Sequence, residues 1–245
     1  MAYKGPADAG YVLIGAANIA PNMETLRIKK IAVLDERNFL GKYISTICDT
    51  GQRRAELAMS GVLNSPDTDA VGDTETTGKV VSALLSGNVV AAGDSVDFYG
   101  FQRAMVSGLE LTVDPEKVDS LTPEFAIVGE FNVGTVVAPH ATRTAGTNTD
   151  TVYVHRRGGA VSGGHAYVHV TSYTANGASA LTIKVRHSAG HVTFADHTTL
   201  TVVTATGATV TALAAASLEA HLSVSWAWTG GTSPTADWFC GVAVD

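Results

Sequence analysis

The feature that most constrains the fold of this chain is an alternation of apolar and polar residues within short segments. Between Thr50 and Gly61, for example, apolar residues recur at every second position through Ala55, Leu57 and Met59, and turn residues stand at both ends. Successive side chains of a strand point to opposite faces, so this period of two predicts a half-buried β-strand. Nothing in the segment is catalytic.

Similar segments occur along the whole chain, separated by turn residues. They cover residues 11–15, 24–34, 105–113, 121–130, 134–139, 151–154, 167–171, 181–187, 200–204, 209–213, 222–228 and 238–244. The pattern in 24–34 slips phase at Lys29 and Lys30, where a β-bulge would restore the inward face. In 181–187 the apolar residues Leu181, Ile183 and Val185 are expected to face the core. The chain is therefore expected to be mainly β.

One helix and one change of composition interrupt this pattern. Thr77 can cap a helix whose apolar face holds Val80, Val81, Leu84 and Leu85, before Gly87 ends it. Residues 141–164 are rich in Thr, Ala, Gly, Asn and Arg, which indicates a linker or flexible rim. The sequence thus predicts a first β domain at 1–140 and a smaller β-sandwich at 165–245, where about six strands have sandwich-like spacing.

Composition bounds the classes of function. The 245 residues contain no run of eighteen apolar residues, so no membrane span is expected, and the first residues lack the pattern of a signal peptide for Sec-type export. Cys48 and Cys240 are far apart and do not form a disulfide framework; two reduced thiols are expected.

The net charge of −7 is unevenly placed. Residues 1–140 hold 18 acidic and 11 basic side chains, whereas residues 141–245 hold 5 of each. An acidic surface repels phosphate, so a sequence-specific reader of nucleic acid is not expected. Ordinary solubility charge is an equally good explanation of the asymmetry.

No motif for an enzyme or a metal site is complete. His165 and His169 lie four residues apart on an expected strand, and His187, His191 and His197 lie on other segments, but no Cys or carboxylate spacing accompanies them. The acidic stretch 67–78 fails as a calcium loop because it ends on glycine in place of glutamate. The stretch 72–79 fails as a phosphate loop, and 177–181 lacks the second glycine of a nucleophile elbow. Neither catalysis nor a cofactor or metal is expected.

Several of these segments resemble a known family. The turn, the paired Arg53 and Arg54, the alternating strand and the terminal Ser-Gly of residues 50–61 are similar to the central strand of major tail tube proteins from long-tailed bacteriophages. The Gly-Asp turn at 93–94, the aromatic and alternating strands after it and the Gly-Thr-Val-Val stretch at 134–137 extend this resemblance over residues 9–139. It implies a tail-tube-type β-sandwich or barrel with one flanking helix. Residues 186–196 resemble small β-sandwich modules attached to phage structural proteins, which implies an outer decoration domain.

The resemblance also implies an assembly. Six copies would form a ring, and rings would stack through the expected loop at 35–50 into a hollow tube within the virion tail, assembled in the host cytoplasm. Its partners would be other copies, the tape measure, the tail terminator and the distal tail or baseplate proteins. DNA would pass an acidic bore without specific binding, and no membrane would be involved. The residues expected at contacts between copies are Asp35, Glu36, Arg37, Lys42, Tyr43, Asp49, Arg53 and Arg54.

Two other classes of function remain open. A virion decoration or adhesion protein that binds host-surface glycans would present Trp226, Trp228 or Trp238 as a platform, although tryptophan in an alternating strand more often belongs to a core. A hydrolase would need a concave site with perturbed acids or histidines, and no motif points to one.

Overall fold

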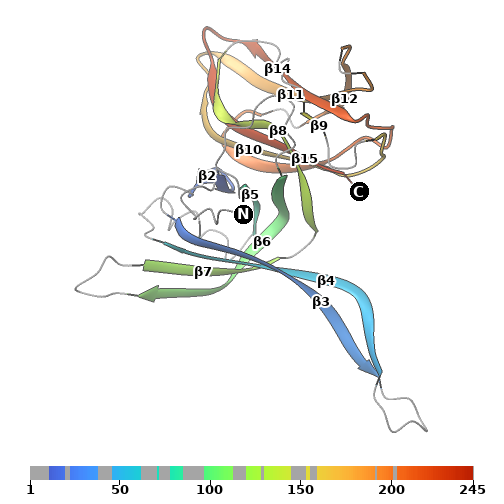
Figure 1. Ribbon diagram of the computed structural model, residues 1–245. Coiled ribbons are helices and arrows are strands. Elements are labelled where there is room, and N and C mark those ends of the chain that lie inside the picture. The colour runs from blue at the N-terminus through green and yellow to red at the C-terminus, as the bar shows by residue number, and fades with distance from the viewer. Residues whose placement is uncertain are drawn as a thin grey trace.

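The computed structural model describes residues 11–19, 23–37, 46–61, 71, 78–84, 97–112, 120–127, 130–144, 153–154, 159–190, 192–200 and 203–244. This part of the chain is almost entirely antiparallel β-structure, which confirms the expected mainly-β class (Figure 1). Its strands are β1 (Tyr11–Ile14), β2 (Ala17–Asn18), β3 (Met23–Arg37), β4 (Thr46–Gly61), β5 (Lys79–Leu84), β6 (Asp97–Thr112), β7 (Ser120–Ile127), β8 (Phe131–Arg143), β9 (Tyr153–Val154), β10 (His165–Thr174), β11 (Ala178–Ser188), β12 (Ala195–Thr199), β13 (Gly207–Ala212), β14 (His221–Gly230) and β15 (Thr235–Ala243). Nowhere in the described ranges is a helix long and apolar enough to span a membrane.

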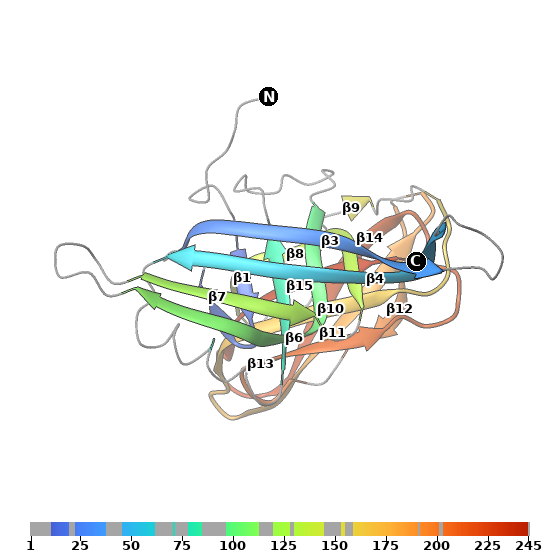
Figure 2. The same cartoon turned by 90° about the horizontal axis from the view of Figure 1, so that it is seen from below.

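The lower layer of the molecule is a four-stranded platform in the order β3, β4, β7 and β6 (Figures 1 and 2). One face of the platform is apolar: Leu57, Met59 and Phe125 are buried there against β1, β5 and the first half of β6. The other face is open in the view of Figure 2. Strand β6 belongs to both layers, because its second half pairs with β7 and its first half pairs with β5 and β8.

The upper layer is a β-sandwich. Its sheet β12–β11–β14–β9 packs against the β13–β10–β15–β8 part of the larger sheet. Leu181, Ile183 and Val185 are fully buried between the two sheets, as their alternation predicts. Cys240 lies in the same core as a free thiol, and burial raises its pKa to about 12. The side chain of Cys48 lies outside the described part of the structure.

The sandwich and the platform share one continuous sheet. Strand β8 pairs with β6 through residues 131–135 and with β15 through residues 135–143, so it passes the predicted domain boundary at 140 without a break. The segment predicted as a linker, 141–164, contributes the end of β8, the short strand β9 and a bridge from Val161 to Leu218. The division into 1–140, 141–164 and 165–245 stays a prediction.

The expected helix at residues 77–86 is wrong, because residues 79–84 form strand β5 between β1 and β6. Val81, Ser82, Ala83 and Leu84 are all buried, since both faces of this strand are covered. A short run that is apolar on both sides has no clear period of two, so its pattern cannot distinguish a buried strand from a helix.

Two strand details also differ from the sequence analysis. The bulge in β3 lies between Ala32 and Leu34, with a second irregularity after Met23, whereas Lys29 and Lys30 pair in regular register with Glu56 and Ala55. The strand expected at 200–204 lies earlier in the chain, as β12. The described part of 200–204 keeps a backbone hydrogen bond from Leu200 to Ile183 and a bridge from Val203 to Leu181.

Glycines let an aromatic cluster form where the layers meet. The buried ring of Phe98 on β6 makes edge contacts with Tyr167 and Phe239, at centroid distances of 5.4 and 5.8 Å. It lies over Gly134 of β8 and Gly241 of β15, where an added Cβ would come within 2.5 Å of a ring carbon. The aromatic cluster therefore requires bare backbone at both positions.

We expect Gly134→Ala to lower the free energy of unfolding by about 1–3 kcal/mol, the usual cost of overpacking a core. The new methyl group would meet the Val242 carbonyl oxygen at 2.4 Å as well as the Phe98 ring, and backbone moves aside less easily than a flexible side chain. Urea unfolding measures the change. Gly190→Ala is the control, because its Cβ would meet no atom within 4 Å. Equal stability of the two variants would contradict the packing argument.

Candidate assembly surface

The platform has two long open edges. Strand β3 pairs with β4 alone among the described strands, and beyond Ala104 the described part of β6 pairs with β7 alone. Each edge therefore presents a row of backbone N–H and C=O groups without a strand partner in the described part of the chain. Such rows are templates for pairing with another chain.

The exposed face of the platform carries charges of both signs. Its described exposed side chains include three cations and three acids, namely Arg27, Lys29, Arg103, Glu56, Glu110 and Glu124. Lys29 Nζ lies 3.8 Å from Glu56 Oε2 in an exposed ion pair of the kind that contributes little to stability. The acidic excess of the first 140 residues is therefore not concentrated on the described part of this face.

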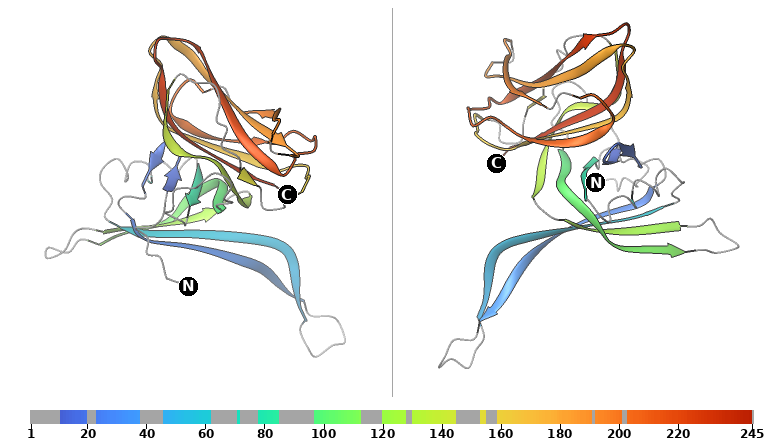
Figure 3. Two further views of the ribbon diagram at one scale, coloured as in Figure 1. Left: turned by 45° about the horizontal axis from the view of Figure 1, so that its top comes forward. Right: turned by 180° about the vertical axis from the view of Figure 1, so that it is seen from behind.

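The β3–β4 hairpin extends beyond the platform as an arm, which we define as residues 31–37 and 46–54 (Figures 1 and 3). Strand β7 supports β4 only from Glu56 to Gly61, so the arm is a two-stranded ribbon. The bulge between Ala32 and Leu34 lies within the arm, and the ribbon bends before its tip. A ribbon of two strands is marginally stable alone in water, so the arm is a candidate contact element.

The arm holds six of the eight residues that the sequence suggested for contacts between copies. They are Asp35, Glu36, Arg37, Asp49, Arg53 and Arg54, and the other two, Lys42 and Tyr43, lie outside the described residues. The register places Asp35 opposite Cys48 and Ile31 opposite Arg54. The long loop expected at 35–50 is wrong at both ends, because β3 continues to Arg37 and β4 begins at Thr46. The alternating signal ends at residue 34 and resumes at residue 50, so the sequence alone could not extend the two strands into this stretch.

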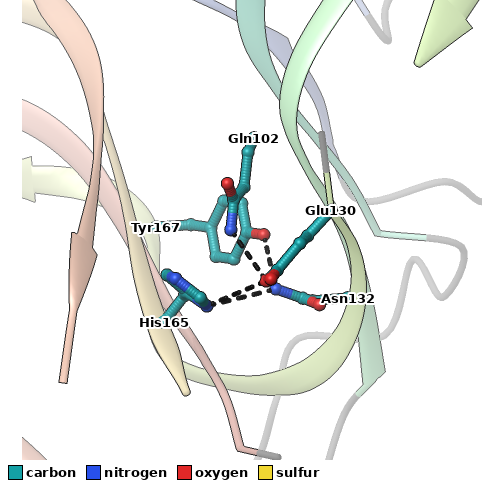
Figure 4. Close-up of polar contacts among 5 residues, drawn as sticks. All are labelled: Gln102, Glu130, Asn132, His165 and Tyr167. Atoms are coloured by element: carbon teal, nitrogen blue, oxygen red, sulfur yellow. Dashed lines mark hydrogen bonds and ion pairs between the residues drawn. The ribbon is translucent and has the colours of Figure 1, made fainter. Parts of the chain in front are cut away.

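A polar cluster lies where the platform strand β6 and strand β8 meet β10 (Figure 4). Gln102 Nε2 donates to Glu130 Oε2 at 3.0 Å, and Asn132 Nδ2 donates to the Tyr167 hydroxyl at 3.0 Å. His165 Nδ1 lies 3.4 Å from Glu130 Oε2, so the two form an ion pair when the imidazole is protonated. Burial raises the pKa of Tyr167 well above its ordinary value, which keeps the phenol neutral. The five side chains include no serine or cysteine nucleophile. Their hydrogen bonds hold the neighbouring strands together.

The histidines that the sequence singled out have separate environments. His169 is fully buried, with Nδ1 2.9 Å from the Gly15 carbonyl oxygen and Nε2 2.9 Å from Ser82 Oγ. It therefore joins β10 to the β1–β2 turn and to β5. His187 and His197 pair edge to face at 5.0 Å, and His191 lies outside the described residues. The described ranges hold no group of three or more His, Cys, Asp or Glu residues placed to bind a metal ion.

The tryptophans pack inward. Trp238 is fully buried, and its ring lies beneath the Arg143 guanidinium at 3.9 Å and edge to face with Trp226 at 5.8 Å. The half-buried Trp226 and Trp228 both direct Nε1 toward the Thr144 carbonyl oxygen, at 3.4 and 3.3 Å. Trp238 thus has no free ring face for a sugar. The β11–β14 sheet also carries a groove of about 270 Å³, whose lining includes Trp226, Lys184 and Asp196; the last two form an ion pair at 2.6 Å.

No protein-family model matches the sequence, and no curated protein matches it. Three solved structures share a remote likeness. A chain of the virion of a native gene transfer agent particle is 14% identical over 54% of this chain and 98% of that chain, with a TM-score of 0.40. A chain of the tail of an empty particle of this kind, with C6 symmetry, is 14% identical over 45% and 80%, with a TM-score of 0.35. The Dit protein of phage SPP1, described as a hub of the adsorption apparatus in phages that infect Gram-positive bacteria, is 9% identical over 96% and 99%, with a TM-score of 0.34.

The buried His169 predicts that acid weakens the fold. Burial lowers its pKa from 6.5 to about 4. The unfolded chain binds the proton first, so stability falls as the pH drops from about 6.5 toward 4, by about 3 kcal/mol in total. Urea unfolding across this pH range measures the loss.

His169→Gln can keep both hydrogen bonds without a titrating group, and we expect it to flatten the pH dependence. The slope that remains reflects His140 and His187, whose pKa values burial also lowers. Ala189→Gln, in the exposed turn between β11 and β12, changes no titrating group and is the control, which should keep the wild-type slope. An unchanged slope in His169→Gln would show that this imidazole does not govern acid sensitivity.

Proposed function

We propose that this chain is the tube subunit of a bacteriophage or prophage tail, and that copies pair head to tail through the open edges of the platform. The observation that carries the proposal is the pair of open edges itself. The four platform strands alternate in direction, so β3 of one copy and β6 of the next run antiparallel, and the pairing repeats from copy to copy. A ring closed in this way is a β-barrel without edges.

The resemblance of residues 9–139 to tail tube proteins supports a hexameric ring and its place in the virion tail. Strands β1 and β5 and the first half of β6 cover the apolar face of the platform, and the sandwich lies beyond them on the same side (Figure 1), so the exposed face would line the bore and the sandwich would decorate the outside. With equal numbers of described cations and acids, this wall lacks the cationic stripe that holds nucleic acid, so DNA would pass without specific binding. Tape measure, terminator and distal tail proteins would contact such a tube, and assembly would take place in the host cytoplasm.

The arm would connect one ring to the next. It extends past the platform and lacks a third strand among the described residues, so a neighbouring ring would supply the surface that stabilises it. Acids at Asp35 and Asp49 and cations at Arg53 and Arg54 give it both signs of charge for contacts with another copy.

Negative-stain electron microscopy over a concentration series tests the proposal. We expect rings, and at higher concentration hollow tubes of uniform diameter with an axial repeat near the ring thickness. Analytical ultracentrifugation of the same samples should show a sharp rise in fast-sedimenting material. A monodisperse monomer at high concentration and low salt would overturn the assignment.

Shortening the arm tests its role in stacking. Leu34 and Asp49 face each other in the register, so an Asn-Gly turn can replace residues 35–48 and close the hairpin there. We expect this variant to form rings and no tubes under conditions in which the wild type forms tubes. Lys184→Ala, on the outer sheet, is the control and should form tubes. Tubes from the shortened variant would show that rings stack through another surface.

A further inference from the structure

We infer that the seam between neighbouring copies is closed by an ion pair between Arg27 or Lys29 on β3 of one copy and Glu110 on β6 of the next. The inference rests on the proposed edge-to-edge ring and names the contact that sets its register. The partner of this surface is a second copy of the same chain.

The acidic side of the seam follows from the pairing of β6. The last residue of β6 that pairs with β5 is Ala104, opposite Lys79. Within the described part of β6, an incoming strand can therefore pair with residues 105–112. Glu110 is the only ionisable residue in that stretch. Its side chain is exposed, and within the described part of the chain it makes no ion pair.

The basic side of the seam lies on β3. Arg27 and Lys29 are exposed and share one face, because they are two residues apart, whereas Leu26 and Ile28 pack toward the core. Arg27 stands opposite Ala58 in the register and has no ion-pair partner among the described residues. Lys29 has only the long contact with Glu56.

The register within one copy shows how the two sides meet. Lys29 lies in a row with Glu56, Ala126 and Met105 across the platform. Arg27 lies in the row of Ala58, Glu124 and Gly108. Glu110 pairs with Thr122, two residues from Glu124 and four from Ala126.

Strands in a barrel are tilted relative to the barrel axis. A row of paired residues is therefore displaced along the strands of the next copy by a fixed number of residues, which is the offset. An offset of two residues brings Arg27 opposite Glu110, and an offset of four brings Lys29 there. Even offsets keep the charged side chains on one face. The reverse offset would move β3 toward Ala104, where β5 already pairs. Offsets of two and four residues along the free edge therefore each place a cation of β3 opposite Glu110.

Charge reversal tests this contact through the critical concentration for assembly, measured by sedimentation at low salt. Opposite charges across neighbouring strands attract and like charges repel. Glu110→Arg should raise the critical concentration by about fivefold or more, as should reversal of the cation opposite it, by Arg27→Glu or Lys29→Glu. One of the two double variants that combine Glu110→Arg with Arg27→Glu or with Lys29→Glu should return to within about twofold of wild type. Ionic strength of about 0.5 M should reduce the defect of the single variants.

Glu124→Lys is the matched control, because it reverses a charge on the same exposed face but on β7, inside the platform. It should assemble like wild type. A Glu110→Arg variant that assembles like wild type, or failure of both double variants to recover, would overturn the ion pair while wild-type tubes still support the proposed function. A wild type that forms neither rings nor tubes would overturn both.

Discussion

Unpaired backbone hydrogen-bonding groups at strand edges are the constraint on which this structure depends. Each edge of a sheet must be short, covered or paired, because its N–H and C=O groups otherwise recruit other strands. The sandwich meets this requirement with short edge strands, β9, β12 and β13. The platform does not, since β3 is long and is paired on one side only among the described strands. This contrast within one molecule is the reason for placing the proposed pairing between copies at the platform edges.

The contact between platform and sandwich is the second determinant of the shape. Strand β6 turns from one layer into the other, and the Phe98 ring fills the corner over two glycines. Polar groups secure the same region, because His169 is hydrogen-bonded to Gly15 and Ser82 inside the fold. Apolar packing that tolerates no added methyl group, together with buried hydrogen bonds, holds the two layers in one orientation. A fixed orientation is what a subunit needs if its edges are to meet those of a neighbour at a constant angle.

The sequence predicted most strands because each is buried on one face, as Leu181, Ile183 and Val185 on β11 show. It failed where that condition fails. Strand β5 is covered on both faces and was taken for a helix, and the parts of the arm at residues 35–37 and 46–50, which lack alternation, were taken for a loop. The open edges could not be foreseen, since an edge is defined by which strands pair and not by the composition of one strand. The polar cluster around Tyr167 has no local signal either, because its members come from segments far apart in the chain.

Strand β8 gives the chain an unusual kind of modularity. Its first residues pair with β6 and its later residues pair with β15, so backbone hydrogen bonds join the sandwich to the platform. A recombination event that exchanged everything after residue 140 would leave one side of β8 bare and would create a new adhesive edge. We expect variation to be tolerated more readily at the turn between β11 and β12, where Ala189 and Gly190 are exposed and Val192 is 87% exposed. The lineage of such a protein would therefore diversify its outer surface by lengthening turns, while the sandwich as a whole is inherited together with the platform.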